Sequence, residues 1–144
     1  MGARFVPHTR KKRVPRKKVL VVENDPDARV IIRRIFEEEG YIVLEASTGL
    51  EALDTLEHQQ DIWLVIGELA LPGIGGLQFA REVKQRYPAQ RMFLLTEYTD
   101  EETIPALAYR VGYDAVLFKP IVVRELKEML NMLLRQDSQK STQK

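Results

Sequence analysis

The chain has 144 residues, of which 44% are hydrophobic, and its net charge is +1. This length fits one compact domain with a core and does not fit a second. Without cysteine the chain forms no disulfide, thiolate metal site or cysteine nucleophile. No apolar run approaches the ~18 residues of a membrane span and no secretory signal opens the chain, so we expect a cytoplasmic protein.

Residues 1–17 are predicted to form a basic arm. All of its charged side chains are basic, Pro7 and Pro15 interrupt it, and it shows no sustained apolar period. This composition is typical of a flexible segment outside the fold. Two interpretations are open: a solvated tail, free or lying against the acidic domain, or a segment that binds the phosphates of nucleic acid or an anionic membrane. Without interleaved aromatic residues or a recognition helix, we do not expect it to read a DNA sequence.

Residues 18–135 are predicted to form the folded domain. Residues 18–22 are a nearly continuous apolar run, which is typical of a strand covered on both faces. Asp25 and Pro26 then predict a helix start, the first as its cap and the second in its first turn. Gly40 supplies the end of that helix.

Two further strands and helices follow. Residues 41–45 are interpreted as the second strand, and Ser47 as the cap of a helix that ends near Glu57. Residues 63–67 are interpreted as the third strand. The apolar positions of the next helix are Leu77, Ala80 and Val83.

The last third of the chain repeats this alternation. Residues 91–96 and 115–117 are interpreted as the fourth and fifth strands. Pro105 is tolerated only near a helix start, so either Asp100 caps a helix that bends or Thr103 caps a shorter one. The final helix is predicted from Val123 to Leu134, followed by a disordered polar tail at 136–144.

Strands that alternate with helices of about 10 to 15 residues predict an α/β fold with a parallel sheet and helices on both faces. Five such units in this length fit a doubly wound, flavodoxin-like fold. In a sheet of this kind, ligands bind beyond the carboxyl ends of the strands. The side chains that follow the predicted strands are therefore the candidates for a site.

Four segments stand at those strand ends: residues 21–26, residues 68–73, residues 94–96, and Lys119-Pro120. In order and spacing they resemble the receiver domain of two-component response regulators, the chemotaxis-type receiver fold. The resemblance covers roughly residues 18–134. It implies five strands in the order 2-1-3-4-5.

Glu68 stands where such receivers carry a phosphate-accepting aspartate. Its extra methylene displaces the carboxylate by about 1.5 Å, which we expect to spoil phosphoryl transfer. A glutamate brings a charge of about −1, compared with about −1.5 to −2 for a phosphate. Two interpretations are open: a partial mimic of the phosphate, and an inert carboxylate.

The two acidic residues that hold Mg²⁺ in receivers correspond to Glu23 and Asn24. Asn24 replaces the direct metal ligand with a neutral amide, and Mg²⁺ prefers charged oxygens in a strict octahedron. Asn24 is otherwise interpreted as a turn residue. We expect no cofactor, or Mg²⁺ held only weakly by Glu23, Asn24, Glu68 and the backbone of Ala70.

The resemblance assigns a phosphoryl contact to Lys119, the switch hydroxyl to Thr96, and a cis peptide bond to Pro120. Charge counting pairs Lys119 with Glu68, because two carboxylates and one ammonium leave −1 and need no dication. Val116 replaces the aromatic partner of the switch hydroxyl. Three of the five switch positions therefore depart from the pattern: Asn24, Glu68 and Val116.

These departures predict an atypical, single-domain response-regulator receiver in phosphorelay signalling. We expect it to be no enzyme and to act by protein-protein interaction without phosphorylation. The resemblance implies partners at the surface of helix 4, strand 5 and helix 5. We expect no output domain after Leu134, so the partner would be a histidine kinase, another regulator or a second copy. Two alternatives remain open: a weak phosphate acceptor that uses Glu68 or Asp25, and an accessory nucleic-acid-binding protein that uses the arm.

Overall fold

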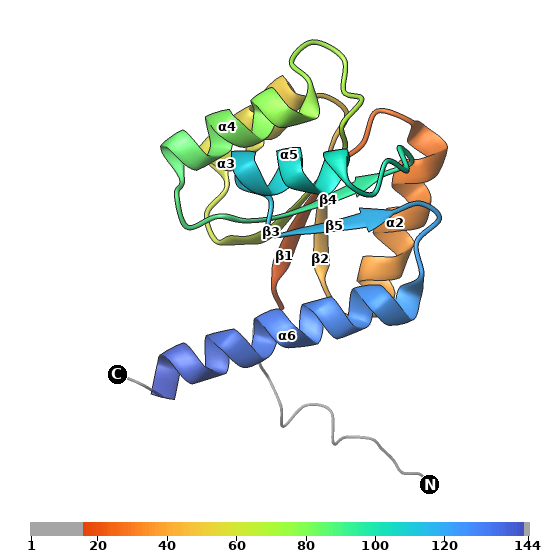
Figure 1. Ribbon diagram of the computed structural model, residues 1–144. Coiled ribbons are helices and arrows are strands. Elements are labelled where there is room, and N and C mark those ends of the chain that lie inside the picture. The colour runs from red at the N-terminus through yellow and green to blue at the C-terminus, as the bar shows by residue number, and fades with distance from the viewer. Residues whose placement is uncertain (1–15, 143–144) are drawn as a thin grey trace, which may run out of the picture.

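Five parallel strands form one sheet in the order β2-β1-β3-β4-β5, with helices on both faces (Figure 1). The computed structural model describes residues 16–142, so most of the predicted basic arm, residues 1–15, and the last two residues, 143–144, lie outside the described residues. The predicted α/β fold and strand order are confirmed. Between residues 16 and 142 no helix is long and apolar enough to cross a membrane.

The strands and helices alternate along the whole domain. The strands are β1 Lys18–Val22, β2 Ile42–Ala46, β3 Ile62–Gly67, β4 Arg91–Thr96 and β5 Ala115–Phe118. The helices are α2 Pro26–Glu38, α3 Gly49–His58, α4 Gly76–Arg86, α5 Thr103–Val111 and α6 Val123–Thr142. The central strands are almost entirely buried, which explains why their sequences are continuous apolar runs.

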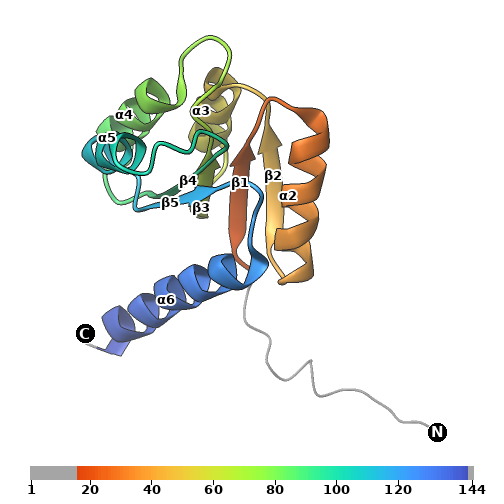
Figure 2. The same ribbon diagram turned by 45° about the vertical axis from the view of Figure 1, so that its right-hand side comes forward.

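Two hydrophobic cores lie on opposite faces of the sheet. The helices α3, α4 and α5 cover one face, and α2 covers the other together with the first part of α6 (Figure 2). Phe79 of α4 is fully buried in the first core, and Phe36 of α2 occupies the second. Both cores leave the carboxyl ends of the strands free of helices, where the loops meet.

The helix starts agree with the sequence in part. Asp25 caps α2 as predicted, because its carboxylate accepts a hydrogen bond from Asp27 N at 3.2 Å. The predicted cap of α3 was wrong, since Thr48 and not Ser47 accepts from Glu51 N, at 3.0 Å. Ser47 instead donates its N–H and hydroxyl to the Glu51 carboxylate, so the hydrogen bonds run in both directions as in a capping box.

The start of α5 resolves the two interpretations of Pro105. The helix begins at Thr103, which places Pro105 in its first turn, where a missing N–H is tolerated. Asp100 lies before the helix, and its carboxylate accepts hydrogen bonds from the N–H groups of Glu102 and Thr103 at 3.2 and 3.0 Å. The shorter helix is therefore the one observed, but Thr103 is its first residue and not its cap, and Asp100 accepts from the N–H groups at its start.

The predicted tail at 136–144 was wrong for its first part, because α6 continues to Thr142. The reason is a polar anchor at Asp137. Its carboxylate accepts a hydrogen bond from Trp63 Nε1 at 2.8 Å and pairs with the guanidinium of Arg91. Trp63 is the second residue of β3 and Arg91 is the first of β4, so the anchor ties the end of α6 to the amino ends of the central strands.

Asp137 gives the fold an acid-sensitive contact. Burial raises the pKa of this carboxyl, but Arg91 and Trp63 lower it more, and the net direction is downward. Because the pKa is lowered in the folded state, the ionised carboxylate stabilises the fold at pH values above about 3.9, the ordinary pKa of aspartate. This stabilisation is lost as the pH falls through the lowered pKa. Asp137→Asn is therefore expected to destabilise the domain by about 1 kcal/mol at pH 7 and by progressively less below about pH 4.

Urea unfolding as a function of pH measures this effect. Glu128→Gln is the matched control, because Glu128 is exposed on the same helix and has no anchoring partner among the contacts of the described residues. A destabilisation by Asp137→Asn that is equal at pH 7 and pH 3 would contradict the contribution of the carboxylate charge.

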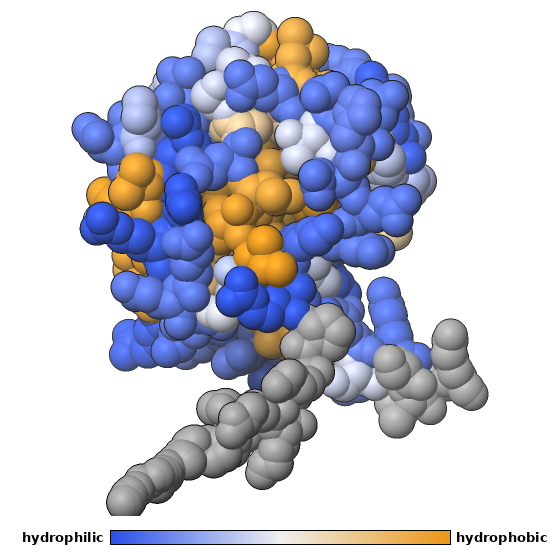
Figure 3. Space-filling view, turned by 180° about the vertical axis from the view of Figure 1, so that it is seen from behind, coloured by the Kyte–Doolittle hydropathy of each residue, from blue (hydrophilic) through white to orange (hydrophobic). Residues whose placement is uncertain are grey.

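The β2 edge carries apolar surface. Figure 3 shows a hydrophobic area in the middle of the face seen from behind, where β2 is the edge strand. Ile42, Val43 and Leu44 are half-buried there. Glu45, at the end of the same strand, pairs with Arg29 at 3.0 Å. A charged side chain on an edge strand disfavours the addition of another strand, and on β2 only Glu45 provides one.

Candidate functional site

Four predicted site residues end neighbouring strands of the sheet. Glu23 follows β1, Glu68 follows β3, Thr96 ends β4 and Lys119 follows β5. Because parallel strands end at the same edge, these residues share one end of the molecule. Three of them, Glu23, Glu68 and Lys119, make direct contact.

The Glu68 carboxylate is buried and fully engaged. The residue is 4% exposed. Its Oε2 accepts hydrogen bonds from Leu69 N at 2.6 Å and from Ala70 N at 3.4 Å. Its Oε1 accepts one from Lys119 Nζ at 2.8 Å. The side chain thus folds back onto the loop that it begins and uses the N–H groups there.

Lys119 is shared between two carboxylates. Its Nζ lies 2.7 Å from Glu23 Oε1 and 2.8 Å from Glu68 Oε1. The other oxygen of Glu23 accepts a hydrogen bond from Asp25 N at 3.1 Å. Burial lowers the pKa of Lys119, whereas the hydrogen bonds and charges of Glu23 and Glu68 raise it, and the net direction is upward. The ammonium therefore stays charged at neutral pH, and the three groups together carry −1.

Asn24 does not join this cluster. It is exposed, and its Nδ2 donates a hydrogen bond to the carbonyl of Ser47 at 3.4 Å, in the loop between β2 and α3. The predicted turn role thus describes its position better than a ligand role. All four carboxylate oxygens of Glu23 and Glu68 already accept hydrogen bonds. The Lys119 ammonium contacts the Oε1 atoms of both carboxylates, and the Asn24 side chain points to Ser47. The expectation of no cofactor, or of Mg²⁺ held only weakly, stays a prediction.

Of the predicted switch residues, Lys119 contacts the carboxylates, whereas Thr96 and Val116 make other contacts. Thr96 is completely buried, and its Oγ1 accepts a hydrogen bond from Tyr98 N at 3.3 Å. Val116 is half-buried against the core on the α3, α4 and α5 face. Phe118 stands opposite Thr96 in the β4 and β5 register, while Val116 stands opposite Leu94. Phe118 therefore stands two positions further along β5 than Val116.

The peptide bond between Lys119 and Pro120 is cis, as the resemblance implied. The N–H of Lys119 donates to the carbonyl of Thr96 at 2.8 Å, which fixes the end of β5 against β4. The ammonium of Lys119 is thereby aimed across the strand ends toward Glu68 and Glu23.

One contact near the site was missed from the sequence. The hydroxyl of Tyr113 donates a hydrogen bond to the carbonyl of Gly76 at 2.9 Å, beneath the loop that follows Glu68. The signal available was Gly67, since a glycine inside a strand often marks the close approach of another group. Tyr113 itself lies just after the end of α5, where the sequence pattern gave it no role.

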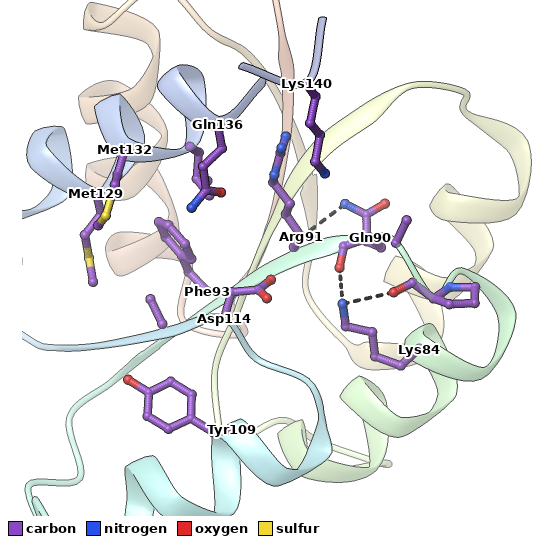
Figure 4. A pocket seen from close by; sticks show the side chains of 14 residues that line it. Lys84, Gln90, Arg91, Phe93, Tyr109, Asp114, Met129, Met132, Gln136 and Lys140 are labelled. Atoms are coloured by element: carbon purple, nitrogen blue, oxygen red, sulfur yellow. Dashed lines mark hydrogen bonds between the residues drawn. The ribbon is translucent and has the colours of Figure 1, made fainter. Parts of the chain in front are cut away.

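A groove lies beside β5, on the surface that includes α5 and α6. Its volume is about 560 Å³. In Figure 4 the side chains of Met129 and Met132 lie at one end, and those of Lys84, Arg91 and Lys140 lie at the other. The groove therefore combines an apolar end with a cationic one.

Comparison with known proteins assigns the whole domain to one type. The family model of the response regulator receiver domain matches residues 19–131. The aerobic respiration control protein ArcA of Escherichia coli (strain K12) is 39% identical over 108 residues, or 75% of this chain and 44% of that protein. The chain therefore spans less than half of that relative's length. A 14.6 kDa protein of Leptolyngbya boryana is 34% identical over 110 residues, which cover 75% of this chain and 82% of that protein.

Solved structures show the same similarity. A CheY-like response regulator receiver domain protein from Methanospirillum hungatei JF-1 has a TM-score of 0.78 and 25% identity, covering 88% of this chain and 99% of that one. The response regulator TrrA of Thermotoga maritima, in complex with Mg²⁺-BeF, has a TM-score of 0.73 and 31% identity, covering 81% and 98%.

Proposed function

The chain belongs to the response regulator receiver domain family of two-component signalling, and we propose that it is an atypical member that acts without a phosphorylation cycle. One observation carries this proposal. Every carboxylate oxygen of Glu23 and Glu68 already accepts a hydrogen bond, and Lys119 neutralises part of their charge. The domain would then serve as a protein-interaction module and not as an enzyme.

The engaged donors support the proposal that phosphoryl transfer is disfavoured. A phosphoryl group at this loop needs hydrogen-bond donors for its oxygens, and the nearest are Leu69 N, Ala70 N and the Lys119 ammonium. The Glu68 carboxylate holds all three. The Glu68 carboxylate places one negative charge against these donors. It thereby acts as a partial, permanent substitute for a phosphate.

The metal site is proposed to be dispensable for the same reason. Two carboxylates held by one ammonium retain a single negative charge and bind a dication poorly, and Asn24 supplies no charge of its own. The domain is thus proposed to keep its site assembled without Mg²⁺.

The partner surface is proposed to lie on α5, β5 and α6, which are the fourth helix, the fifth strand and the fifth helix of the fold. Support comes from the groove of about 560 Å³ there, whose methionines adapt to varied apolar surfaces. Tyr109 and Met132 on this surface are 54% and 48% exposed. A histidine kinase, another regulator or a second copy of the chain is the proposed partner.

Incubation with acetyl phosphate and Mg²⁺, followed by intact-mass measurement of the native protein, tests the proposal. We expect no adduct. A stoichiometric, base-labile mass increase of one phosphoryl group, mapped to Glu68 or to Asp25, would establish the weak phosphate acceptor instead.

Glu68→Asp alone is expected not to restore a working switch. The shorter side chain corrects the reach of the carboxylate, but Asn24 still withholds a charged metal ligand and Val116 still provides no aromatic partner for Thr96. Isothermal titration with Mg²⁺ and beryllofluoride measures the outcome. The matched comparison is Glu68→Asp combined with Asn24→Asp, which should bind Mg²⁺ at least about tenfold more tightly than Glu68→Asp. Tight beryllofluoride uptake by the single variant would show that the site is less altered than proposed.

A further inference from the structure

Tyr113 lies in the core between the α5 and β5 junction and the loop that begins with Glu68. The residue is 2% exposed and follows Gly112, which ends α5 in a left-handed conformation with φ of +117°. Its N–H donates to the carbonyl of Ala108 at 3.0 Å. The backbone of Tyr113 is therefore fixed to the end of α5, while its ring reaches toward the other end of the sheet.

A continuous series of hydrogen bonds connects this ring to the site. The Tyr113 hydroxyl donates to the carbonyl of Gly76 at 2.9 Å. The N–H of Gly76 donates to the carbonyl of Leu69 at 3.0 Å, and the N–H of Leu69 donates to Glu68 Oε2 at 2.6 Å. The next contact is the ion pair of Glu68 with Lys119. Each step is local, and together they join α5 to the carboxylate cluster.

Gly67 makes room for the tyrosine. A Cβ at Gly67 would lie 2.5 Å from the Tyr113 hydroxyl oxygen and 3.2 Å from the nearest ring carbon. A separation of 2.5 Å is far below van der Waals contact, so no larger residue fits at position 67 while the hydroxyl is present. The last residue of β3 and the hydroxyl of Tyr113 are thus matched in shape.

The environment keeps the hydroxyl protonated. Burial, and then the nearby charge of Glu68, raise the pKa of Tyr113 above its ordinary value. The hydroxyl consequently remains a donor to Gly76 over the physiological pH range.

We infer that Tyr113 is a positioning residue that sets the Glu68 loop and couples it to the α5 and β5 surface. This coupling takes the place of the relay through Thr96 and an aromatic residue at position 116, which the observed contacts do not form. The inference rests on the proposed function, because it concerns the surface assigned there to a partner.

A double-mutant cycle of Gly67→Ala and Tyr113→Phe tests the fit. In the wild-type background, Gly67→Ala is expected to lower the folding equilibrium constant about tenfold or more, because the methyl group overlaps the hydroxyl. In the Tyr113→Phe background the same change should lower it less than about threefold, or raise it, since alanine suits a strand better than glycine. Tyr41→Phe is the control background, because Tyr41 is a buried tyrosine of the other core.

Coupling is measured separately from packing. Glu68→Gln perturbs the site, and ¹⁵N–¹H spectra report where the amide signals move. We expect the signals of Gly112 and Asp114 to move in the wild-type background and to stay in place in the Tyr113→Phe background. The signals of Leu69 and Lys119 should move in both, which shows that the perturbation is present. A tyrosine that only fills space would leave the movement at Gly112 unchanged.

An additive cycle, or movement at Gly112 that survives Tyr113→Phe, would overturn the inference. If Gly67→Ala does not fold alone, the double variant decides: a folded double variant supports the fit and an unfolded one refutes it. Neither measurement uses phosphate. A phosphoryl adduct on the wild-type protein would therefore refute the proposed function without affecting the cycle, and an additive cycle would leave the proposed function standing.

Discussion

Replacing Lys119 with methionine is expected to destabilise the domain by about 3 kcal/mol, because it leaves two buried carboxylates without a counter-charge. The side chains of Glu23 and Glu68 are only 7% and 5% exposed, and their Oε1 atoms lie 2.7 and 2.8 Å from the ammonium. Methionine keeps much of the apolar stem of lysine, so loss of packing contributes little. Urea unfolding at pH 7 measures the difference.

Lys127→Met is the matched control. Lys127 pairs with Glu39 at 3.7 Å but is 52% exposed, so this change should cost less than about 0.5 kcal/mol. Combining Lys119→Met with Glu68→Gln removes one of the two carboxylate charges that repel each other. The double variant should therefore recover part of the lost stability. A Lys119→Met protein as stable as the wild type would show that the ion pairs do not hold the site together.

The same variant is expected to acquire a response to divalent cations. Once the ammonium is gone, Glu23 and Glu68 present facing carboxylate oxygens, which are ligands that Mg²⁺ prefers. Millimolar MgCl₂ should therefore raise the unfolding temperature of Lys119→Met and leave that of the wild type unchanged. Equal shifts in both proteins would indicate binding elsewhere.

Gly76→Ala is expected to cost about 3 kcal/mol or more, since a Cβ there has no room. It would lie 2.1 Å from the carbonyl oxygen of Glu68 and 2.8 Å from Leu69 Cα. Both are backbone atoms, which cannot rotate away as a flexible side chain can. The loop after Glu68 would have to move, and the 3.0 Å hydrogen bond from Gly76 N to Leu69 O would be lost with it.

Gly75→Ser provides the neighbouring control for this prediction. A Cβ at Gly75 would lie 3.7 Å from the carbonyl oxygen of Leu69, which is ordinary contact. Gly75 is also the N-cap of α4, where serine is favoured, so the change should be within about 0.5 kcal/mol of neutral. Similar destabilisation by both substitutions would mean that the loop tolerates no change at all, and close approach at Gly76 would not explain it.

The strands were predictable because their burial leaves a direct mark on the sequence. Residues 18–22 and 91–96 are apolar runs bounded by polar residues, and β1 and β4 match these ranges. The end of α6 was not predictable in this way. Its apolar period fades near Leu134, whereas the helix is extended by Asp137, whose partners Trp63 and Arg91 lie 74 and 46 residues away in the sequence. Polar contacts over such distances leave no periodic pattern.

The contacts of the candidate site also include some that could be predicted from the sequence and some that could not. The contact between Glu68 and Lys119 was expected from the resemblance, with charge counting in support, and the structure has it at 2.8 Å. The orientation of Asn24 toward Ser47 and of the Thr96 hydroxyl toward Tyr98 depends on loop geometry, which neither spacing nor composition determines. Tyr113 was missed because its significance depends on the space left by Gly67, a relation between two residues that have no common motif.

The fully hydrogen-bonded carboxylates of Glu23 and Glu68 have a consequence for how such a protein transmits a signal. A receiver that gains and loses a phosphate records a past event for as long as the acyl phosphate survives. A domain with a permanent charge in that place keeps no record of this kind. Its binding to a partner then depends on how much of it is present relative to the dissociation constant. The rates at which the protein is synthesised and degraded would then set the signal. The response would depend on the concentration of the protein and not on the lifetime of an acyl phosphate.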